Sequence, residues 1–240
     1  TSRPRNPLMT IKAYVIALRG DEVVNKAVQR LNDSAPSNAI MHNFDAVVPK
    51  RVSVLSRTYN LEWNYPWSGQ EMDIKSGLIK SAYPTKEPKR RIACFFSHYL
   101  LWLRCIAMEE PIIIHEHDAC YFNDDPLPLE AMAASPYTII GLNDPRKATR
   151  LSGSYHTKVQ EQPLDICRAP EIDQPMVPQG IAGNSSYYIE PKGADKMIGL
   201  TKEFGAWPND ALMCRQLVPK LGQTKKYYTY VQGIQSTTSS

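Results

Sequence analysis

Acidic and imidazole side chains follow a short apolar run near the middle of the chain. Residues 111–114 read Pro-Ile-Ile-Ile, and the next four residues are His115, Glu116, His117 and Asp118. A short apolar run that ends in polar residues is typical of a buried strand. Glu116 and Asp118 are two residues apart, so both carboxylates can converge on one hard divalent cation. Such a cation keeps open positions for phosphate oxygens, which suits a nucleotide diphosphate.

Two other interpretations of this stretch remain open. Polar residues after a strand also occur as an ordinary solvated loop. A hydrolytic zinc site would use His115 and His117, but such sites need further histidines at fixed spacings, and the sequence has no H-E-x-x-H motif. The remaining histidines are His42, His98 and His156. We therefore expect a hard-cation site rather than a zinc hydrolase.

The composition predicts one globular domain. The chain has 240 residues, of which 42% are hydrophobic and 22% are charged. It contains no apolar run of about 18 residues, the length that a membrane span requires. Residues 1–8 are polar and contain proline, so we expect a flexible leader before a single domain at residues 9–240. The net charge of +4 permits an anionic partner.

The cysteines favour a cytoplasmic location. They are odd in number, widely scattered and free of C-x-x-C spacing, which is typical of reduced thiols. The five are Cys94, Cys105, Cys120, Cys167 and Cys214.

Strand and helix patterns alternate in the first half of the chain. Residues 11–18 form a near-continuous apolar run, a helical pattern starts at Asp21, and we expect a second strand at residues 39–44. The most clearly periodic helix covers residues 92–109. We therefore predict an α/β fold with a mostly parallel central sheet flanked by helices.

The second half continues the pattern. Strands are expected at residues 137–142, 180–190 and 225–231, and helices at 191–202 and from Trp207. The strand at 137–142 runs into Asn143 and Asp144, so a second strand delivers polar groups to the carboxyl edge of the sheet.

Two segments with weak periodicity predict loop insertions near residues 59–91 and 146–176. The first contains the loosely spaced rings of Tyr59, Trp63, Tyr65 and Trp67, which suit either simple packing or a planar or sugar-like ligand. It ends in a basic cluster at residues 86–91, which suits either a solvated face or contact with phosphates.

Several segments, in order, resemble glycosyltransferase family 25, the group of lipooligosaccharide galactosyltransferases and collagen galactosyltransferase-like domains. The resembling segments are AYVIAL with Arg19, CFFSHYLLW from Cys94, Glu116-His117-Asp118-Ala119, YYIEPKGA from Tyr187, and Trp207-Pro208-Asn209-Asp210. The resemblance implies a single GT-A domain, a nucleotide-sugar donor and a divalent cation, commonly Mn²⁺, with Mg²⁺ as the alternative; we expect the donor to be UDP-linked. It also implies inversion at the anomeric carbon.

The resemblance also implies roles for individual residues. Glu116 and Asp118 would hold the metal and the donor diphosphate, and Asp210 would be the general base, with Asp144 as the rival base. The donor-binding residues would be Leu18, Arg19, Ser97, His98, Glu116, His117, Asp118 and Asn184. His98 alone, on so apolar a helix, is more often a core histidine than a catalyst. His117 departs from the family pattern because it replaces the middle acid of the motif, and the resemblance assigns no third metal ligand.

Three functions follow as hypotheses. The favoured acceptor is a 5-hydroxymethylated pyrimidine in DNA, because aromatic rings near Trp63 and Trp67 precede basic residues that could hold a nucleic-acid backbone and an extruded base. The Glu-His-Asp motif also resembles phage-encoded relatives. The first alternative acceptor is a lipooligosaccharide or another surface glycan. The second alternative is a non-catalytic domain that binds nucleotide or nucleic acid.

Overall fold

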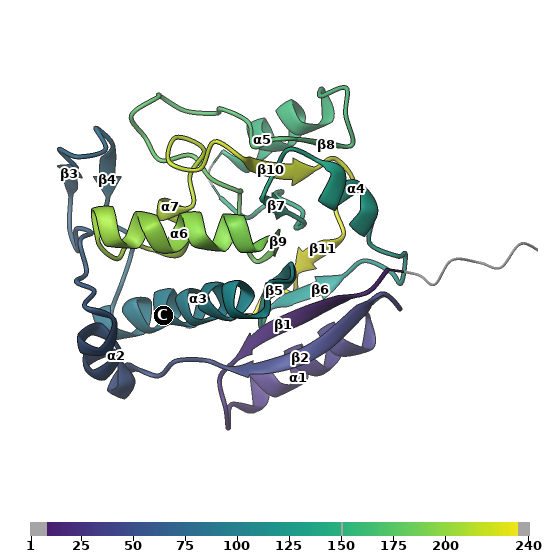
Figure 1. Ribbon diagram of the computed structural model, residues 1–240, viewed down its shortest axis with the longest axis horizontal. Coiled ribbons are helices and arrows are strands. Elements are labelled where there is room, and N and C mark those ends of the chain that lie inside the picture. The colour runs from purple at the N-terminus through teal and green to yellow at the C-terminus, as the bar shows by residue number, and fades with distance from the viewer. Residues whose placement is uncertain (1–8, 150, 235–240) are drawn as a thin grey trace, which may run out of the picture.

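A seven-stranded mixed sheet forms the centre of the molecule, with the strand order β2-β1-β5-β9-β7-β10-β8 (Figure 1). The computed structural model describes residues 9–149 and 151–234, so the leader expected at residues 1–8 lies outside the described residues. Two small two-stranded sheets, β6–β11 and β3–β4, accompany the central sheet in the described part of the chain.

Five of the seven strands run in one direction. β1 (Ile11–Ala17) pairs in parallel with β2 (Ala39–Asp45) and β5 (Ile112–Glu116). β7 (Ile139–Gly141) pairs in parallel with β10 (Leu221–Thr224). The exceptions are β9 (Ser186–Ile189), which is antiparallel between β5 and β7, and β8 (Ile166–Arg168), which is antiparallel at the edge. The prediction of a mostly parallel α/β sheet flanked by helices is confirmed.

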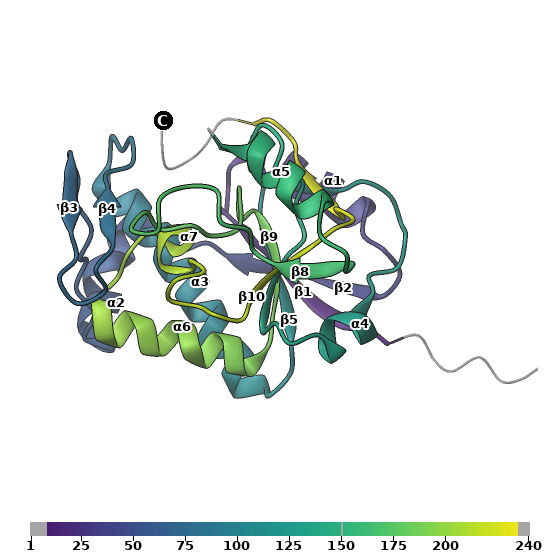
Figure 2. The same ribbon diagram turned by 90° about the horizontal axis from the view of Figure 1, so that it is seen from above.

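Helices cover both faces of this sheet (Figures 1 and 2). α3 (Pro88–Met108) and α6 (Pro191–Phe204) pack on the face that carries Ile112 and Ile114. α1 (Glu22–Asp33) and α4 (Leu129–Ala134) pack on the face that carries Ile113. Successive strand residues point to opposite faces, so the apolar run in β5 is buried from both sides.

The helix starts follow capping rules. The Asp21 carboxylate accepts hydrogen bonds from the backbone N–H groups of Val23 and Val24 at 2.9 and 3.0 Å and so begins α1. α3 begins at Pro88 rather than at residue 92, because proline is favoured in the first helical turn, where its missing N–H costs nothing. The basic residues 89–91 therefore lie in the first turn of α3 rather than in front of it.

Short elements precede and form part of the first predicted insertion, near residues 59–91. A 3₁₀ turn, η1 (Pro49–Arg51), and α2 (Val52–Tyr59) precede a hairpin of β3 (Gln70–Met72) and β4 (Ile79–Ser81). The hairpin lies at the end of the molecule near α6 (Figures 1 and 2), where the Lys75 ammonium donates to the Glu203 carbonyl at 3.0 Å. The fully buried Lys80 anchors it, with its Nζ atom 3.1 Å from Glu71 and 3.6 Å from Asp73.

The prediction of a long loop after residue 146 was wrong. The segment contains α5 (Ser152–Gln160) as well as β8, and α5 buries only Ser152, Tyr155 and Val159. Three buried residues give too narrow an apolar stripe to stand out in the sequence.

The last predicted elements also differ from the structure. The strand expected at residues 225–231 is shorter: β11 (Thr229–Val231) pairs with β6 (Ala119–Tyr121), and β10 precedes it. The helix expected from Trp207 is a single turn, α7 (Asn209–Leu212).

Gly193 lets α6 approach the sheet closely. A Cβ atom at this position would lie 2.5 Å from the Thr138 carbonyl oxygen, whereas a Cβ atom at Gly199 on the same helix meets nothing within 4 Å. We expect Gly193→Ala to lower the free energy of unfolding by about 1–3 kcal/mol, because the backbone must shift to relieve the overlap. Gly199→Ala, the matched control, should raise it by up to about 1 kcal/mol through helix propensity. Urea unfolding measures both, and equal effects of the two variants would contradict the close approach.

Candidate active site

A cavity of about 570 Å³ opens at the carboxyl ends of β1, β2 and β5. The start of α1 and the first half of α3 close its sides. This is the edge of an α/β sheet where ligands commonly bind. The predicted donor-binding residues that line the cavity are Leu18, Ser97, His98, Glu116, His117 and Asp118.

Ser97 shapes the cavity wall. Its hydroxyl donates to the Ala93 carbonyl at 3.1 Å and accepts from the Val47 N–H at 2.9 Å. It therefore ties the segment after β2 to α3. Arg19, in contrast, is exposed outside the cavity lining, where its guanidinium pairs with Asp45 at 2.6 Å.

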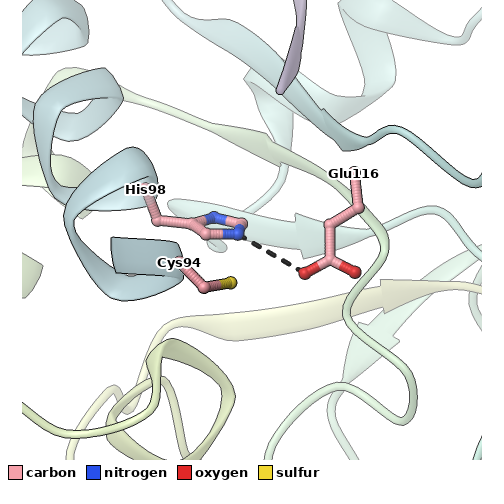
Figure 3. A group of neighbouring side chains, drawn as sticks. All are labelled: Cys94, His98 and Glu116. Carbon is pink, nitrogen blue, oxygen red and sulfur yellow. Dashed lines mark ion pairs between the residues drawn. The ribbon is translucent and has the colours of Figure 1, made fainter. Parts of the chain in front are cut away.

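Glu116 faces two side chains of α3 (Figure 3). Cys94 and His98 are one helical turn apart, and their ligand atoms and a carboxylate oxygen of Glu116 all lie within 4.8 Å of one another. The His98 Nε2 atom is 3.5 Å from Glu116 Oε1, and its Nδ1 atom is 2.8 Å from the Tyr187 hydroxyl. Burial lowers the pKa of His98 to about 4, so the imidazole is neutral at pH 7.

Three carboxylates share this region. Burial, and then the charge of Asp210, raise the pKa of Glu116 to about 8, although its side chain still exposes 32% of its surface. Burial, and then Glu116, raise the pKa of Asp118. Burial also raises the pKa of Asp210, although this residue is exposed by its surface area, and Arg91 and Tyr83 oppose that shift. Among the described residues, burial and mutual repulsion therefore make these three carboxylates costly to ionise.

Several buried polar atoms of Asp118 and of segments bonded to it have no hydrogen-bond partner among residues 9–149 and 151–234. Asp118 Oδ1 is one of them, and Asn184 has two, its Oδ1 and Nδ2 atoms. The chain brings their segments together, because the Glu116 N–H donates to the Ser185 carbonyl and the Gln232 N–H donates to the Asp118 carbonyl, each at 2.8 Å. The Ser185 Oγ and Gln232 Oε1 atoms also lack partners. Such groups are rare in folded proteins, and water, an ion or a ligand can supply the missing bonds.

The structure separates the two rival bases. Asp210, on α7, contributes to the pKa shifts of Glu116, His98 and Cys94. Its charge therefore acts on the same group of side chains as that of Glu116. Asp144 instead binds Arg146 with contacts of 2.6, 3.0 and 3.1 Å. Burial raises the Asp144 pKa, but the hydrogen bonds from Arg146 outweigh burial, so the pKa is lowered.

A profile of glycosyltransferase family 25 (LPS biosynthesis protein) matches residues 10–213. The chain belongs to glycosyltransferase family 25. The predicted family and the predicted class of enzyme are confirmed. No curated protein sequence matches this family 25 chain.

Two solved glycosyltransferases have similar folds. The apo form of mouse xyloside xylosyltransferase 1 shares 9% identity and a TM-score of 0.45, over 89% of this chain and 84% of that chain. Apo GlyE of Streptococcus pneumoniae TIGR4 shares 12% identity and a TM-score of 0.40, over 89% of this chain and 45% of that chain. The family 25 chain therefore spans less than half the length of GlyE.

Three candidate site residues, Cys94, Ser185 and Gln232, were not predicted from the sequence. Cys94 precedes His98 by four residues, a spacing that puts both on one helix face, so it could have been found. Ser185 and Gln232 lie in irregular segments, where no periodicity indicates which way a side chain points.

Within residues 9–149 and 151–234, none of the helices is long and apolar enough to cross a membrane.

His115, next to the site, makes the stability depend on pH. Its ring is fully buried between Ser186 and Tyr121, and burial lowers its pKa from 6.5 to about 3. Between these values the unfolded chain binds a proton that the folded chain excludes, so stability falls as the pH falls, by about 1.4 kcal/mol per pH unit. We expect His115→Gln to remove this part of the slope in urea unfolding between pH 4.5 and pH 6. An unchanged slope would contradict a neutral buried imidazole.

Proposed function

We propose that this chain transfers a sugar from a UDP-sugar to an acceptor hydroxyl, with inversion and with the help of a divalent cation. The observation that carries the proposal is the set of carboxylates Glu116, Asp118 and Asp210 at the carboxyl edge of the sheet. Membership of family 25 supports the class of reaction.

Glu116 and Asp118 would hold the cation. They supply the hard oxygen ligands that Mn²⁺ and Mg²⁺ prefer, and Asp118 Oδ1 is a buried oxygen with no hydrogen-bond partner in the part of the chain that the structure describes. Gln232 is bonded to the Asp118 backbone, and its Oε1 atom is available as a further oxygen ligand. A bound cation would neutralise charge that develops on the leaving diphosphate.

The chain's own groups account for the other needs of the reaction. Apolar cavity residues, among them Ile16 and Leu18, offer a surface for the nucleotide base. Asn184 and Ser185 would bind donor oxygens through buried polar atoms that have no hydrogen-bond partner among the described residues. Asp210 would accept the proton of the acceptor hydroxyl, and its raised pKa brings it closer to the working pH, where a general base is most effective. One base suffices for an inverting displacement.

The first proposed acceptor is a saccharide hydroxyl. The family's description as an LPS biosynthesis protein favours it. Trp63 and Trp67 also support it: their rings stack at 5.1 Å with a 10° tilt, and Trp67 is 41% exposed, so a sugar ring can pack on its free face.

A 5-hydroxymethylated pyrimidine in DNA is the second proposed acceptor. Exposed cations flank the cavity-lining residues Pro49 and Glu87, which suits a phosphate backbone. They are Lys50, Arg51, Lys86 and Lys89.

The test is release of UDP from a panel of UDP-sugars in Mn²⁺, with oligosaccharide, unmodified DNA or 5-hydroxymethylcytosine DNA as acceptor. Stimulation by oligosaccharide alone supports the first acceptor, and stimulation by hydroxymethylated DNA alone supports the second. Binding of UDP or DNA without any release would instead indicate the non-catalytic binding domain and contradict the proposed reaction.

A further inference from the structure

Cys94 gives the Glu116 region a donor atom that a Mn²⁺ or Mg²⁺ site does not use. Its sulfur, the His98 imidazole and a Glu116 oxygen lie within 4.8 Å of one another (Figure 3), and Cys94 and Glu116 both line the cavity. Oxygen ligands suit Mg²⁺ and Mn²⁺, whereas a thiolate with an imidazole selects Zn²⁺ and similar ions. Three protein ligands beside a cavity leave a fourth position for water or substrate.

His98 is the second observation that points to a ligand. The side chain is fully buried, yet its Nε2 atom, which faces Glu116 at 3.5 Å, has no hydrogen-bond partner in the described part of the chain. A metal at Nε2 requires the ring proton on Nδ1, and the Tyr187 hydroxyl oxygen, 2.8 Å from Nδ1, can accept it. An outer hydrogen bond of this kind is the usual support of a metal-bound histidine.

We propose that Cys94, His98 and Glu116 form a second cation site, specific for Zn²⁺ or an ion of similar softness, that competes with the donor cation for Glu116. The competition rests on the proposed function, because it needs Glu116 in the donor site. Binding releases the Cys94 thiol proton to solvent and forms a metal–sulfur bond. Zinc at this site withdraws Glu116 from the donor cation and inhibits sugar transfer.

The first experiment is titration of the metal-free protein with Co²⁺, a coloured substitute for Zn²⁺, followed by displacement with Zn²⁺. We expect a near-ultraviolet sulfur-to-cobalt absorption band that Zn²⁺ abolishes. Cys94→Ser should lose the band, and His98→Gln should weaken binding about tenfold or more. Cys105→Ala is the matched control, because Cys105 is a thiol of the same helix that contacts only backbone carbonyls among its described hydrogen bonds. It should keep the band, and thermal unfolding checks that each variant is folded.

A fourth variant separates this proposal from the proposed function. Asp118→Asn removes a ligand of the donor cation but none of the Cys94 site, so it should keep the cobalt band while losing Mn²⁺-dependent donor binding. No band in the wild type, or an equal band in folded Cys94→Ser, would overturn the zinc site whatever the transferase assays show. A zinc-displaceable band with no sugar transfer would leave the zinc site standing and contradict only the proposed reaction.

Discussion

Asp210→Asn should lower the rate of sugar transfer by about 100- to 10,000-fold, the usual contribution of a general base, and leave donor binding close to that of the wild type. Asparagine keeps the shape of the side chain but cannot take the acceptor proton. The expectation follows from the charge of Asp210, which acts to raise the pKa values of Glu116 and His98, although Asp210 does not itself line the cavity. Single-turnover kinetics and calorimetry of UDP binding separate the two effects.

Asp144→Asn is the matched comparison for that variant. Asp144 is held by Arg146 through contacts as short as 2.6 Å, so its carboxylate is already engaged. Replacing Asp144 by asparagine should mainly remove this ion pair and should not affect turnover as Asp210→Asn does. Normal turnover in Asp210→Asn together with loss of turnover in Asp144→Asn would transfer the role of base to Asp144.

Glu116→Gln and Asp118→Asn should each weaken binding of Mn²⁺ and of the donor together, by about tenfold or more. Each variant removes one negative charge and one anionic oxygen from the proposed cation site. Calorimetry of UDP binding with Mn²⁺ and with EDTA measures the loss. The wild type should show a large difference between the two conditions, and the variants a small one.

Asp125→Asn controls for the change in net charge. Asp125 pairs with Lys226 at 2.7 Å and does not line the cavity. It should bind Mn²⁺ and UDP as the wild type does. A loss in Asp125→Asn equal to that in Asp118→Asn would show a general charge effect instead of a cation site.

The acidic strand end was predictable because its information is local. The Ile-Ile-Ile run indicates burial, and Glu116 and Asp118 follow it directly, so the sequence places both at the end of a strand. The resemblance to family 25 singled out Asp210, but only the tertiary structure brings its charge close enough to raise the pKa of Glu116, since the two residues are 94 positions apart in the chain.

The helix α5 and the strand β10 were not predicted because they bury polar side chains. β10 reads Leu-Gly-Gln-Thr, which has no strand-like apolar pattern, yet all four residues are buried. Gln223 makes this possible, because its side-chain amide donates to the Gly141 carbonyl and its side-chain oxygen accepts from the Tyr155 hydroxyl. Tyr155 lies on α5, so the helix and the strand that the sequence did not reveal depend on the same long-range hydrogen bonds.

The most direct test of the proposed function is the initial rate of UDP release from a panel of UDP-sugars, measured on metal-free protein as Mn²⁺ is added. We expect no release in EDTA and a saturable rise with Mn²⁺ for at least one sugar, and Asp118→Asn should show no such rise. Release at the same rate in EDTA and in Mn²⁺ would contradict a cation-dependent transferase built on Glu116 and Asp118.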